Sequence, residues 1–296
     1  MRALTQLLVV TCLILAGLGC SGSYSPVTYT EADTDANTSL TVNTAGAVMQ
    51  VSPALFTDFT DAQFMGLYLD NLNWVASIAS GTGGNLFKIE NLALSSTYPG
   101  DNGTGYLSMT VRANVKEGAE ITTFREKEYH YGTYMTRLKP SPVAGCINAF
   151  FTKNFTGFND EIDIEFLTNT FGGGKGQVEF TLHPHVGASG SQYHRVINLD
   201  FDPSQAFHEY GFEWTYAQIE YFIDGKSITT FKRSEGAPIQ THPGTMMYNV
   251  WVSANPAWGG GPPTQDATMV VDWCKFWPEG TSINDEPEIV QFQAKQ

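Results

Sequence analysis

Residues 160–166 read Asp-Glu-Ile-Asp-Ile-Glu-Phe, so acidic and apolar side chains alternate along this segment. Successive side chains of a β-strand point to opposite faces, and the alternation therefore predicts a strand with two unlike faces. One face would carry three carboxylates in a row, Glu161, Asp163 and Glu165, with no lysine or arginine between them. The segment thus requires a fold in which a strand packs one face into a core and leaves an acidic face outside it.

Short segments with strand character, separated by turn residues, follow one another along the rest of the chain. The clearest cover residues 107–111, 131–138, 147–152, 208–214, 219–223, 227–231, 246–252 and 269–277. Asp224-Gly225 lies between two of them and predicts a tight hairpin turn. No block with helical periodicity interrupts the series. The pattern predicts an all-β sandwich in one domain.

The N-terminus has the features of a targeting segment. Arg2 supplies a positive charge, and residues 7–18 form an apolar stretch of about the length found in signal peptides. Cys20 ends a Gly-Leu-Gly-Cys sequence that resembles a bacterial lipobox, in which the cysteine carries a lipid. The expected location is therefore extracytoplasmic, either as a lipoprotein anchored in the outer or cell-surface membrane through Cys20 or as a secreted protein.

Composition divides the chain into four parts. Residues 1–20 are expected to be a signal peptide of the lipoprotein type, and residues 21–52 a flexible tether rich in Ser and Thr. Residues 53–278 would form the folded domain, and residues 279–296 an acidic tail.

The formal net charge of −14 restricts the partners of the protein. A phosphate backbone would be repelled, so no nucleic acid is expected to bind. The same charge favours a neutral polysaccharide over a polyanionic one. The protein is expected to be a monomer.

Two cysteines, Cys146 and Cys274, fall in the folded domain. In an oxidising compartment they could form one disulfide. Both lie in apolar, strand-like segments, which also suits buried thiols. The sequence leaves the two alternatives open.

The acid row allows three interpretations from the residues alone. Crowded carboxylates repel one another, so at least one should hold its proton to a higher pH than usual. One protonated and one ionised carboxyl is the pair that glycoside hydrolysis requires. The row could instead bind calcium, or be a solvated edge of a sheet. The Cα atoms of Glu161 and Glu165 would lie about 13 Å apart on an ideal strand, which leaves the stereochemistry of hydrolysis open.

Residues 161–167, Glu-Ile-Asp-Ile-Glu-Phe-Leu, resemble the signature of glycoside hydrolase family 16. The form without an extra bulge residue is typical of lichenases (β-1,3-1,4-glucanases) and xyloglucan endotransglycosylases. The resemblance extends over most of residues 55–278. The similar flanking segments, in the same order, are residues 131–134, 137–140, 147–152, 208–214 and 246–251.

The resemblance implies a concanavalin-like jelly-roll sandwich of two curved antiparallel sheets, with a glycan cleft on the concave face. It also implies a retaining double displacement. Glu161 matches the nucleophile of the family, Glu165 the general acid/base, and Asp163 the residue that tunes both.

Aromatic and polar residues supply candidates for the substrate cleft, because sugar rings stack on aromatic side chains. Trp251 matches an aromatic of the family at a glucose subsite, and Asn249 would share its strand face. Trp258 lies in a loop-like Gly-rich stretch, where it either contacts substrate or anchors the loop. Trp214, Trp273 and Trp277 lie in apolar alternating strands and are expected in the core.

Three further residues are weaker substrate-binding candidates. Arg125 matches an arginine of the family near the non-reducing side of the cleft, or is an ordinary cation at a strand edge. His183 aligns with a substrate-facing position, or lies in a solvated loop; the His-Pro-His that it begins is weak support for a metal. Phe151 either lines the cleft floor or belongs to the core.

Departures from the family pattern leave the exact glucan open. Phe158 and Asn159 stand where lichenases often carry a tryptophan, and Thr123 stands where they carry a glutamate. The predicted function is an endo-β-glucanase acting on a neutral β-glucan with β-1,3-1,4 or β-1,3 linkages. The alternatives are a glucan or xyloglucan transglycosylase and a lectin-like binding protein. No cofactor and no metal ligand is expected in the site, although folds of this kind can hold a structural calcium ion.

Overall fold

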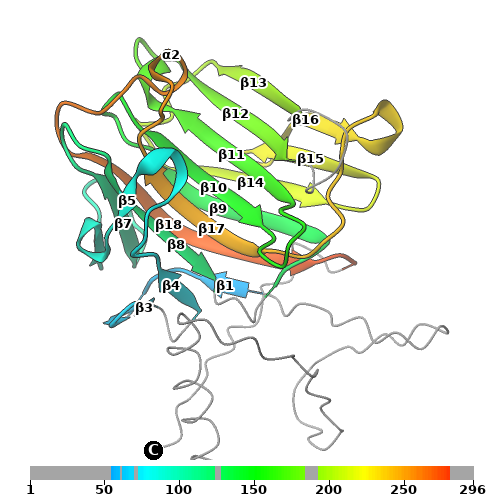
Figure 1. Cartoon of the computed structure of the whole chain (residues 1–296), viewed down its shortest axis with the longest axis horizontal. Helices are drawn as coiled ribbons and strands as arrows, with labels where there is room; N and C mark the ends of the chain where they lie inside the picture. The colour runs from blue at the N-terminus through cyan, green and yellow to red at the C-terminus, as the bar shows by residue number, and fades with distance from the viewer. Residues whose placement is uncertain (1–54, 61, 70–72, 124–127, 184–192, 281–296) are drawn as a thin grey trace, which may run out of the picture. The chain divides into compact units, whose positions relative to one another are not determined.

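The structure is a computed structural model that describes residues 55–60, 62–69, 73–123, 128–183 and 193–280 (Figure 1). The expected signal peptide and tether, nearly all of the acidic tail, and Arg125 lie outside the described residues. Within the described part of the chain, no helix has the length and apolar character needed to cross a membrane.

Two large antiparallel sheets make up the described domain, which confirms the predicted all-β sandwich (Figure 1). In the first sheet the strands follow the order β16 (Lys226–Lys232), β15 (Gln218–Ile223), β14 (His208–Trp214), β9 (Gly132–Lys139), β18 (Ala267–Pro278), β7 (Tyr106–Val111) and β6 (Leu92–Ser95), and β1 (Leu55–Thr57) also pairs with β18.

The second sheet carries the acid row of Glu161, Asp163 and Glu165. Its strand order is β13 (Tyr193–Leu199), β12 (Gly176–His183), β11 (Glu161–Leu167), β10 (Ile147–Lys153), β17 (Thr245–Trp251), β8 (Glu117–Thr123), β4 (Trp74–Ala76), β3 (Tyr68–Leu69) and β2 (Phe64–Met65). A short strand, β5 (Leu86–Phe87), pairs in parallel with β8. In the described ranges, four 3-10 turns and one helical turn connect the strands: η1 (Thr82–Gly84), η2 (Ile89–Asn91), η3 (Thr168–Thr170), η4 (Arg233–Glu235) and α2 (Pro256–Gly259).

The core lies between the two sheets and is rich in aromatic side chains. Ile162, Ile164 and Phe166 of β11 are fully buried in it, as the alternation predicted. The ring of Phe166 meets Tyr210 of the opposite sheet edge to face, with the centroids 4.6 Å apart. Burying each large apolar side chain of this kind stabilises the fold by roughly 1.5–3 kcal/mol. The strand is thereby fixed in the register that turns its acids away from the core.

The hairpin predicted at Asp224-Gly225 is confirmed. Both residues have positive φ, 48° and 71°, as a two-residue hairpin turn of the commonest kind requires. The carboxylate of Asp224 also accepts a hydrogen bond from the backbone nitrogen of Glu209 at 2.9 Å. The turn therefore fixes the register between β15 and β16 on the first sheet.

The expectation that Trp214, Trp273 and Trp277 lie in the core was wrong in part. Trp214 is buried in the core, as predicted. Trp277 is buried but is not part of the core cluster, and Trp273 is partly exposed on the outer face of β18. Cys274 and Phe276 occupy the core-facing positions of that strand instead. Lys275, on the same outer face, places its ammonium 5.1 Å from the centroid of the Trp273 ring. Both faces of β18 carry large apolar side chains, so alternation alone did not reveal which set faces the core.

Cys146 and Cys274 are free, buried thiols, so of the two alternatives the structure shows the unpaired one.

Candidate active site

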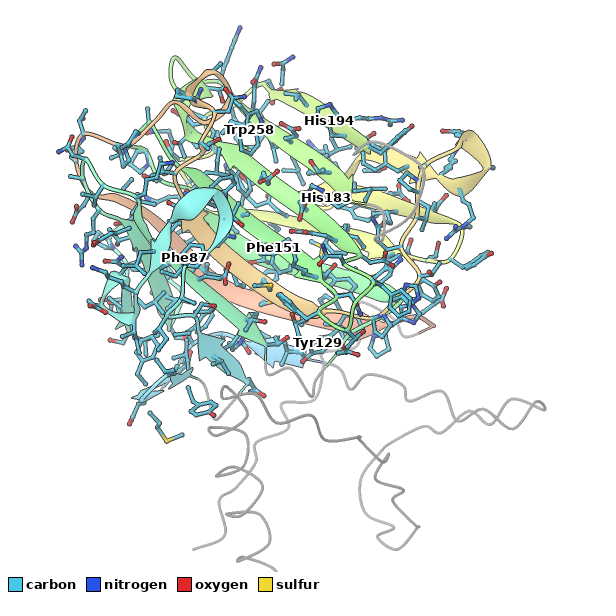
Figure 2. All side chains as sticks on the ribbon, in the orientation of Figure 1. Phe87, Tyr129, Phe151, His183, His194 and Trp258 are labelled. Atoms are coloured by element: carbon cyan, nitrogen blue, oxygen red, sulfur yellow. The ribbon has the colours of Figure 1, made fainter. Side chains whose placement is uncertain are left out.

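A cleft of about 270 Å³ lies on the face of the second sheet that points away from the core (Figure 2). It crosses β12, β11, β10 and β17, and η1 and α2 border it. Its lining residues are Thr82, Ala149, Phe151, Lys153, Glu161, Asp163, Glu165, His183, Asn249, Trp251 and Trp258. Eight of the nine candidate residues from the sequence are among them, and the ninth, Arg125, lies outside the described residues.

The acid row forms the middle of the cleft because β11 is paired on both sides. On the β10 side, Lys153, Phe151 and Ala149 stand opposite Glu161, Asp163 and Glu165 in that order. On the β12 side, His183, Thr181 and Glu179 stand opposite the same three acids. The three carboxyl groups therefore have different neighbours, and their chemistry differs accordingly.

Glu161 has a fixed counter-ion. The ammonium of Lys153 lies 2.6 Å from Oε2 of Glu161. Both side chains are mostly buried, with 18% of Glu161 and 26% of Lys153 exposed. A cation at this distance favours the ionised form of a carboxylate. Among the described residues, Glu161 is thus the acid of the row that has a lysine as its counter-ion.

Asp163 is buried between the other two acids. Burial, followed by the charge of Glu161, raises the pKa of Asp163 to about 7. Nε2 of His183 lies 3.0 Å from Oδ2 of Asp163 and opposes part of that rise. Burial lowers the pKa of His183, but the hydrogen bond to Asp163 raises it. The pKa of His183 therefore lies above its ordinary value. The pair can hold a proton at the centre of the row near neutral pH.

Glu165 is the acid that keeps its proton most strongly. Burial raises its pKa well above the ordinary value, and the charges of Asp163, Glu179 and Glu161 add to the rise. Among the described residues Glu165 has no ion pair that would oppose this effect. The two ends of the row therefore differ: Glu161 is paired with a lysine, whereas the pKa of Glu165 is raised.

One group of three in the cleft has the spacing of metal ligands among the residues that the structure describes. An oxygen of Glu161, an oxygen of Asp163 and a ring nitrogen of His183 lie within 4.8 Å of one another. However, the Lys153 ammonium already binds Glu161, and the His183 ring already bonds to Asp163. These contacts suit a network of proton-sharing groups better than a cation site. The structural calcium ion stays a prediction without an assigned site.

Two tryptophans build the upper wall of the cleft. The rings of Trp251 and Trp258 have centroids 5.8 Å apart and a tilt of 46°. Trp251 packs against Phe87, Ile147 and Leu167, which hold it rigidly. Asn249 lies two residues earlier on the same strand face, as predicted, and its Nδ2 is 3.4 Å from Oε2 of Glu120. Rigid aromatic surface beside amide groups is the usual composition of a sugar-binding wall.

Phe151 and Trp258 both line the cleft, and for Phe151 this decides between the two alternatives. Phe151 packs with Ala149 and Met247 in a small apolar cluster on the cleft side of the sheet, so it lines the cleft and is outside the main core. Trp258 belongs to the helical turn α2, which the sequence interpretation took for a loop; the side chain of Asn255 caps that turn by accepting a hydrogen bond from the nitrogen of Ala257 at 3.1 Å.

The sequence interpretation missed three charged residues: Lys153 lines the cleft, and Glu120 and Glu179 bond to the lining residues Asn249 and Trp258. Lys153 follows Phe151 by two positions in β10, so the alternation of that strand contained the signal. Glu179 precedes His183 by four positions in β12 in the same way. Burial raises the pKa of Glu120, which accepts a hydrogen bond from Ser77 at 2.7 Å. Which of several glutamates would reach the cleft depended on strand pairing, and the sequence did not supply the pairing.

The departures from the family pattern lie at the edge of the site. The ring of Phe158 stacks on His242 with the centroids 3.6 Å apart, just before β11 begins. Thr123 is fully buried, and its hydroxyl accepts a hydrogen bond from the nitrogen of Met246 at 3.0 Å. Thr123 therefore bonds to the protein backbone and does not line the cleft.

Comparison with known proteins gives consistent matches. Residues 88–275 match the model of the glycosyl hydrolases family 16. A β-glucanase of Acetivibrio thermocellus is 37% identical over 132 residues, which are 43% of this chain and 36% of that protein. A β-glucanase of Bacillus licheniformis is 27% identical over 215 residues, which are 64% of this chain and 83% of that protein.

A solved structure extends the similarity to the whole described fold. The crystal structure of a prokaryotic β-1,3-1,4-glucanase (lichenase) from a mouse hindgut metagenome superposes with a TM-score of 0.60 at 25% identity, covering 76% of this chain and 99% of that one. The predicted jelly-roll architecture is thereby confirmed. The alignments nevertheless span only 36–57% of the length of the first curated relatives.

Proposed function

Because this chain belongs to glycosyl hydrolase family 16, we propose that it is an endo-acting β-glucanase that cuts internal bonds of a neutral β-glucan with retention of configuration. Relatives that carry the name β-glucanase support the reaction class. The proposed substrates are mixed-linkage β-1,3-1,4-glucan and β-1,3-glucan, and the net charge of −14 supports a neutral chain.

The observation that carries the proposal is the difference between the surroundings of Glu161 and those of Glu165. Glu161 is paired with Lys153, whereas burial and neighbouring charges raise the pKa of Glu165 well above its ordinary value. A retaining mechanism needs one ionised nucleophile and one protonated acid on neighbouring positions. Both candidate groups lie on one face of β11, which supports the proposal.

In the first step the carboxylate of Glu161 attacks the anomeric carbon and forms an ester with the sugar. The bond from that carbon to the glycosidic oxygen breaks, and Glu165 gives its proton to the leaving oxygen. In the second step Glu165, now ionised, takes a proton from water. The water oxygen attacks the anomeric carbon and releases Glu161 as a carboxylate.

Asp163 and the tryptophans complete the proposal. Asp163, with its pKa raised to about 7, can share a proton with its neighbours as Glu161 changes between carboxylate and ester. Trp251 and Trp258 would stack on glucose rings, and Asn249 would bond to hydroxyl groups. His183 would hydrogen-bond to Asp163 and contact substrate at the cleft surface.

The cellular location is part of the proposal and rests on the sequence. Residues 1–20 would direct the chain out of the cytoplasm, and Cys20 would carry the lipid. Membrane fractionation of cells that express the wild type or Cys20→Ser tests this directly. Loss of the variant from the membrane fraction supports lipidation, and equal fractionation contradicts it.

Product analysis of the wild type and Glu161→Gln on mixed-linkage glucan, laminarin and xyloglucan tests the function. The wild type should release oligosaccharides from the interior of a glucan, and the variant should lose about 10³-fold or more in turnover because it lacks the nucleophile. Glu209→Gln, on an exposed side chain of the first sheet, is the control and should keep full activity. Products longer than the substrate would indicate a transglycosylase, and binding without products a lectin.

A further inference from the structure

A fourth carboxylate borders the acid row without belonging to it. Glu179 stands opposite Glu165 in the pairing of β12 with β11 and is only 3% exposed. A carboxylate buried beside other acids is unfavourable unless specific partners bind it. Its contacts therefore indicate what it does.

Both oxygens of Glu179 have partners, and each partner comes from a different element. The indole nitrogen of Trp258 donates to Oε2 at 2.7 Å. Nδ1 of His194, on the edge strand β13, is hydrogen-bonded to Oε1. In the view of Figure 2, Trp258 and His194 both lie above His183. Glu179 thus joins the catalytic strand region to the wall of the cleft.

The contact matters for Trp258 because its ring packs against the buried cluster around Trp251 but stays partly exposed. The residue lies in a single helical turn, α2, and its side chain is only partly buried. Its ring is tilted against Trp251 and is not stacked flat on it. A charged acceptor at 2.7 Å is a strong, directional hydrogen bond that sets the orientation of the indole.

We infer that Glu179 is a positioning residue for the proposed hydrolysis: one of its oxygens orients the Trp258 ring in the cleft wall, and its carboxylate faces Glu165 across the strand pair so that Glu165 stays protonated. The inference rests on the proposed function, which assigns Glu165 as the general acid. It adds a residue that couples substrate stacking to the protonation of that acid.

The charged and titratable groups around Glu165 come from four strands. They are Glu161 and Asp163 on β11, Glu179 and His183 on β12, Lys153 on β10 and His194 on β13. Burial is the largest cause of the raised pKa of Glu165, and the charge of Glu179 adds to it. The charges of Asp163 and Glu161 also raise the pKa of Glu165. However, Asp163 is hydrogen-bonded to His183, and Glu161 is paired with Lys153, both at the cleft floor. Glu179 differs because its histidine lies on the outer side, away from β11.

Two variants separate the two roles. Glu179→Gln removes the charge but keeps an oxygen that can accept from Trp258. Trp258→Phe removes the N–H donor but keeps the charge of Glu179. Glu209→Gln again serves as the control for loss of an exposed glutamate. Circular dichroism and thermal unfolding establish that each variant is folded.

The readouts are the pH dependence of kcat, the KM, and the ¹³C carboxyl resonance of Glu165 followed by NMR across a pH titration. For Glu179→Gln we expect the basic limb of kcat and the Glu165 titration to move about one pH unit toward acid, with KM within twofold. For Trp258→Phe we expect KM to rise about 5-fold or more, with an unchanged basic limb and an unchanged titration.

The NMR titration distinguishes failure of this inference from failure of the proposed function, because it does not depend on turnover. If the Glu165 resonance titrates at the same pH in the wild type and in Glu179→Gln, the electrostatic role is overturned. An unchanged KM in Trp258→Phe overturns the role in orienting the ring. Absence of glucan hydrolysis by the wild type, with the titration shifted as expected, overturns only the proposed function.

Discussion

The ammonium nitrogen of Lys153 lies 2.6 Å from Oε2 of Glu161, so the acid at one end of the row has a fixed counter-ion from the neighbouring strand. Glu165, at the other end, faces Ala149 on that strand instead. The asymmetry of the row is therefore built by the pairing of β10 with β11. Without it, three equivalent acids would share their protons and no single nucleophile would be defined.

Replacing Lys153 by Met should reduce turnover at neutral pH about 10-fold or more. The reason is that Glu161 loses the charge that favours its ionised form, and a charge-assisted hydrogen bond contributes about 1.5–3 kcal/mol. Steady-state kinetics on mixed-linkage glucan measure the effect. Lys226→Met, at an exposed position of the first sheet, is the control. Full activity of Lys153→Met would mean that the ion pair has no part in the reaction.

Replacing Asn85 by Ala should weaken both stability and substrate binding. Asn85 is fully buried; its side chain donates to the carbonyl of Val252 at 2.8 Å and accepts from the nitrogen of Val252 at 2.8 Å. The variant leaves both backbone groups unpaired, at a cost of roughly 2–4 kcal/mol in the free energy of unfolding.

The effect on binding follows from the turn that Asn85 holds. A Cβ atom on Gly83 would lie 3.2 Å from the ring of Trp251, so the η1 turn packs directly against that ring. We expect a KM several-fold above that of the wild type, measured beside chemical denaturation. Asn198→Ala, exposed on β13, should change neither quantity. An unchanged KM in Asn85→Ala would show that the turn does not position Trp251.

Replacing Asp163 by Asn should stabilise the fold at neutral pH while lowering activity. The pKa of Asp163 is raised from 3.8 to about 7 in the fold, mainly by burial. Between these two values the folded state binds more protons than the unfolded chain, so the free energy of unfolding falls as pH rises. Asn carries no charge and avoids that loss.

The measurement is the Tm of both proteins as a function of pH. At pH 7 the variant should unfold about 2–4 °C higher, which corresponds to about 1 kcal/mol for a domain of this size. The difference should shrink toward pH 4, where the aspartate is protonated in the folded state, and that pH is the internal control. A variant less stable than the wild type at pH 7 would contradict the charge argument.

Cys146 and Cys274 should be inert in the folded protein. Burial raises the pKa of the Cys146 thiol to about 11 and that of the Cys274 thiol to about 12, and the thiolate is the reactive form. A water-soluble thiol reagent, followed by peptide mass spectrometry, should label neither residue until denaturant is added. Labelling without denaturant would show that the core opens, and recovery of the two peptides joined would show a disulfide.

The alternation of the sequence was sufficient to predict the strands and the face of β11 that carries the acids. Each of the predicted strands is present, with its ends within one or two residues of the prediction. In a strand that is buried on one face, every second side chain must face the core, so the alternation identifies the strand. The same rule placed Asn249 and Trp251 together on β17.

What the sequence could not supply was the pairing between strands. Lys153 and Glu179 flank the acid row only because β10 and β12 pair with β11 in one register. Trp273 shows the other limit: both faces of β18 carry large apolar side chains, so alternation did not separate the core face from the outer one. Interactions between distant segments set these features.

The most direct test of the account is the stereochemistry of azide rescue in Glu161→Ala, followed by ¹H NMR with an aryl β-glucan oligosaccharide as substrate. Without the nucleophile, azide should enter from the vacated side of the sugar and give an α-glycosyl azide, with activity restored as azide is added. A β-glycosyl azide, or no rescue in a folded variant, would contradict the assignment of Glu161 as the nucleophile of a retaining enzyme.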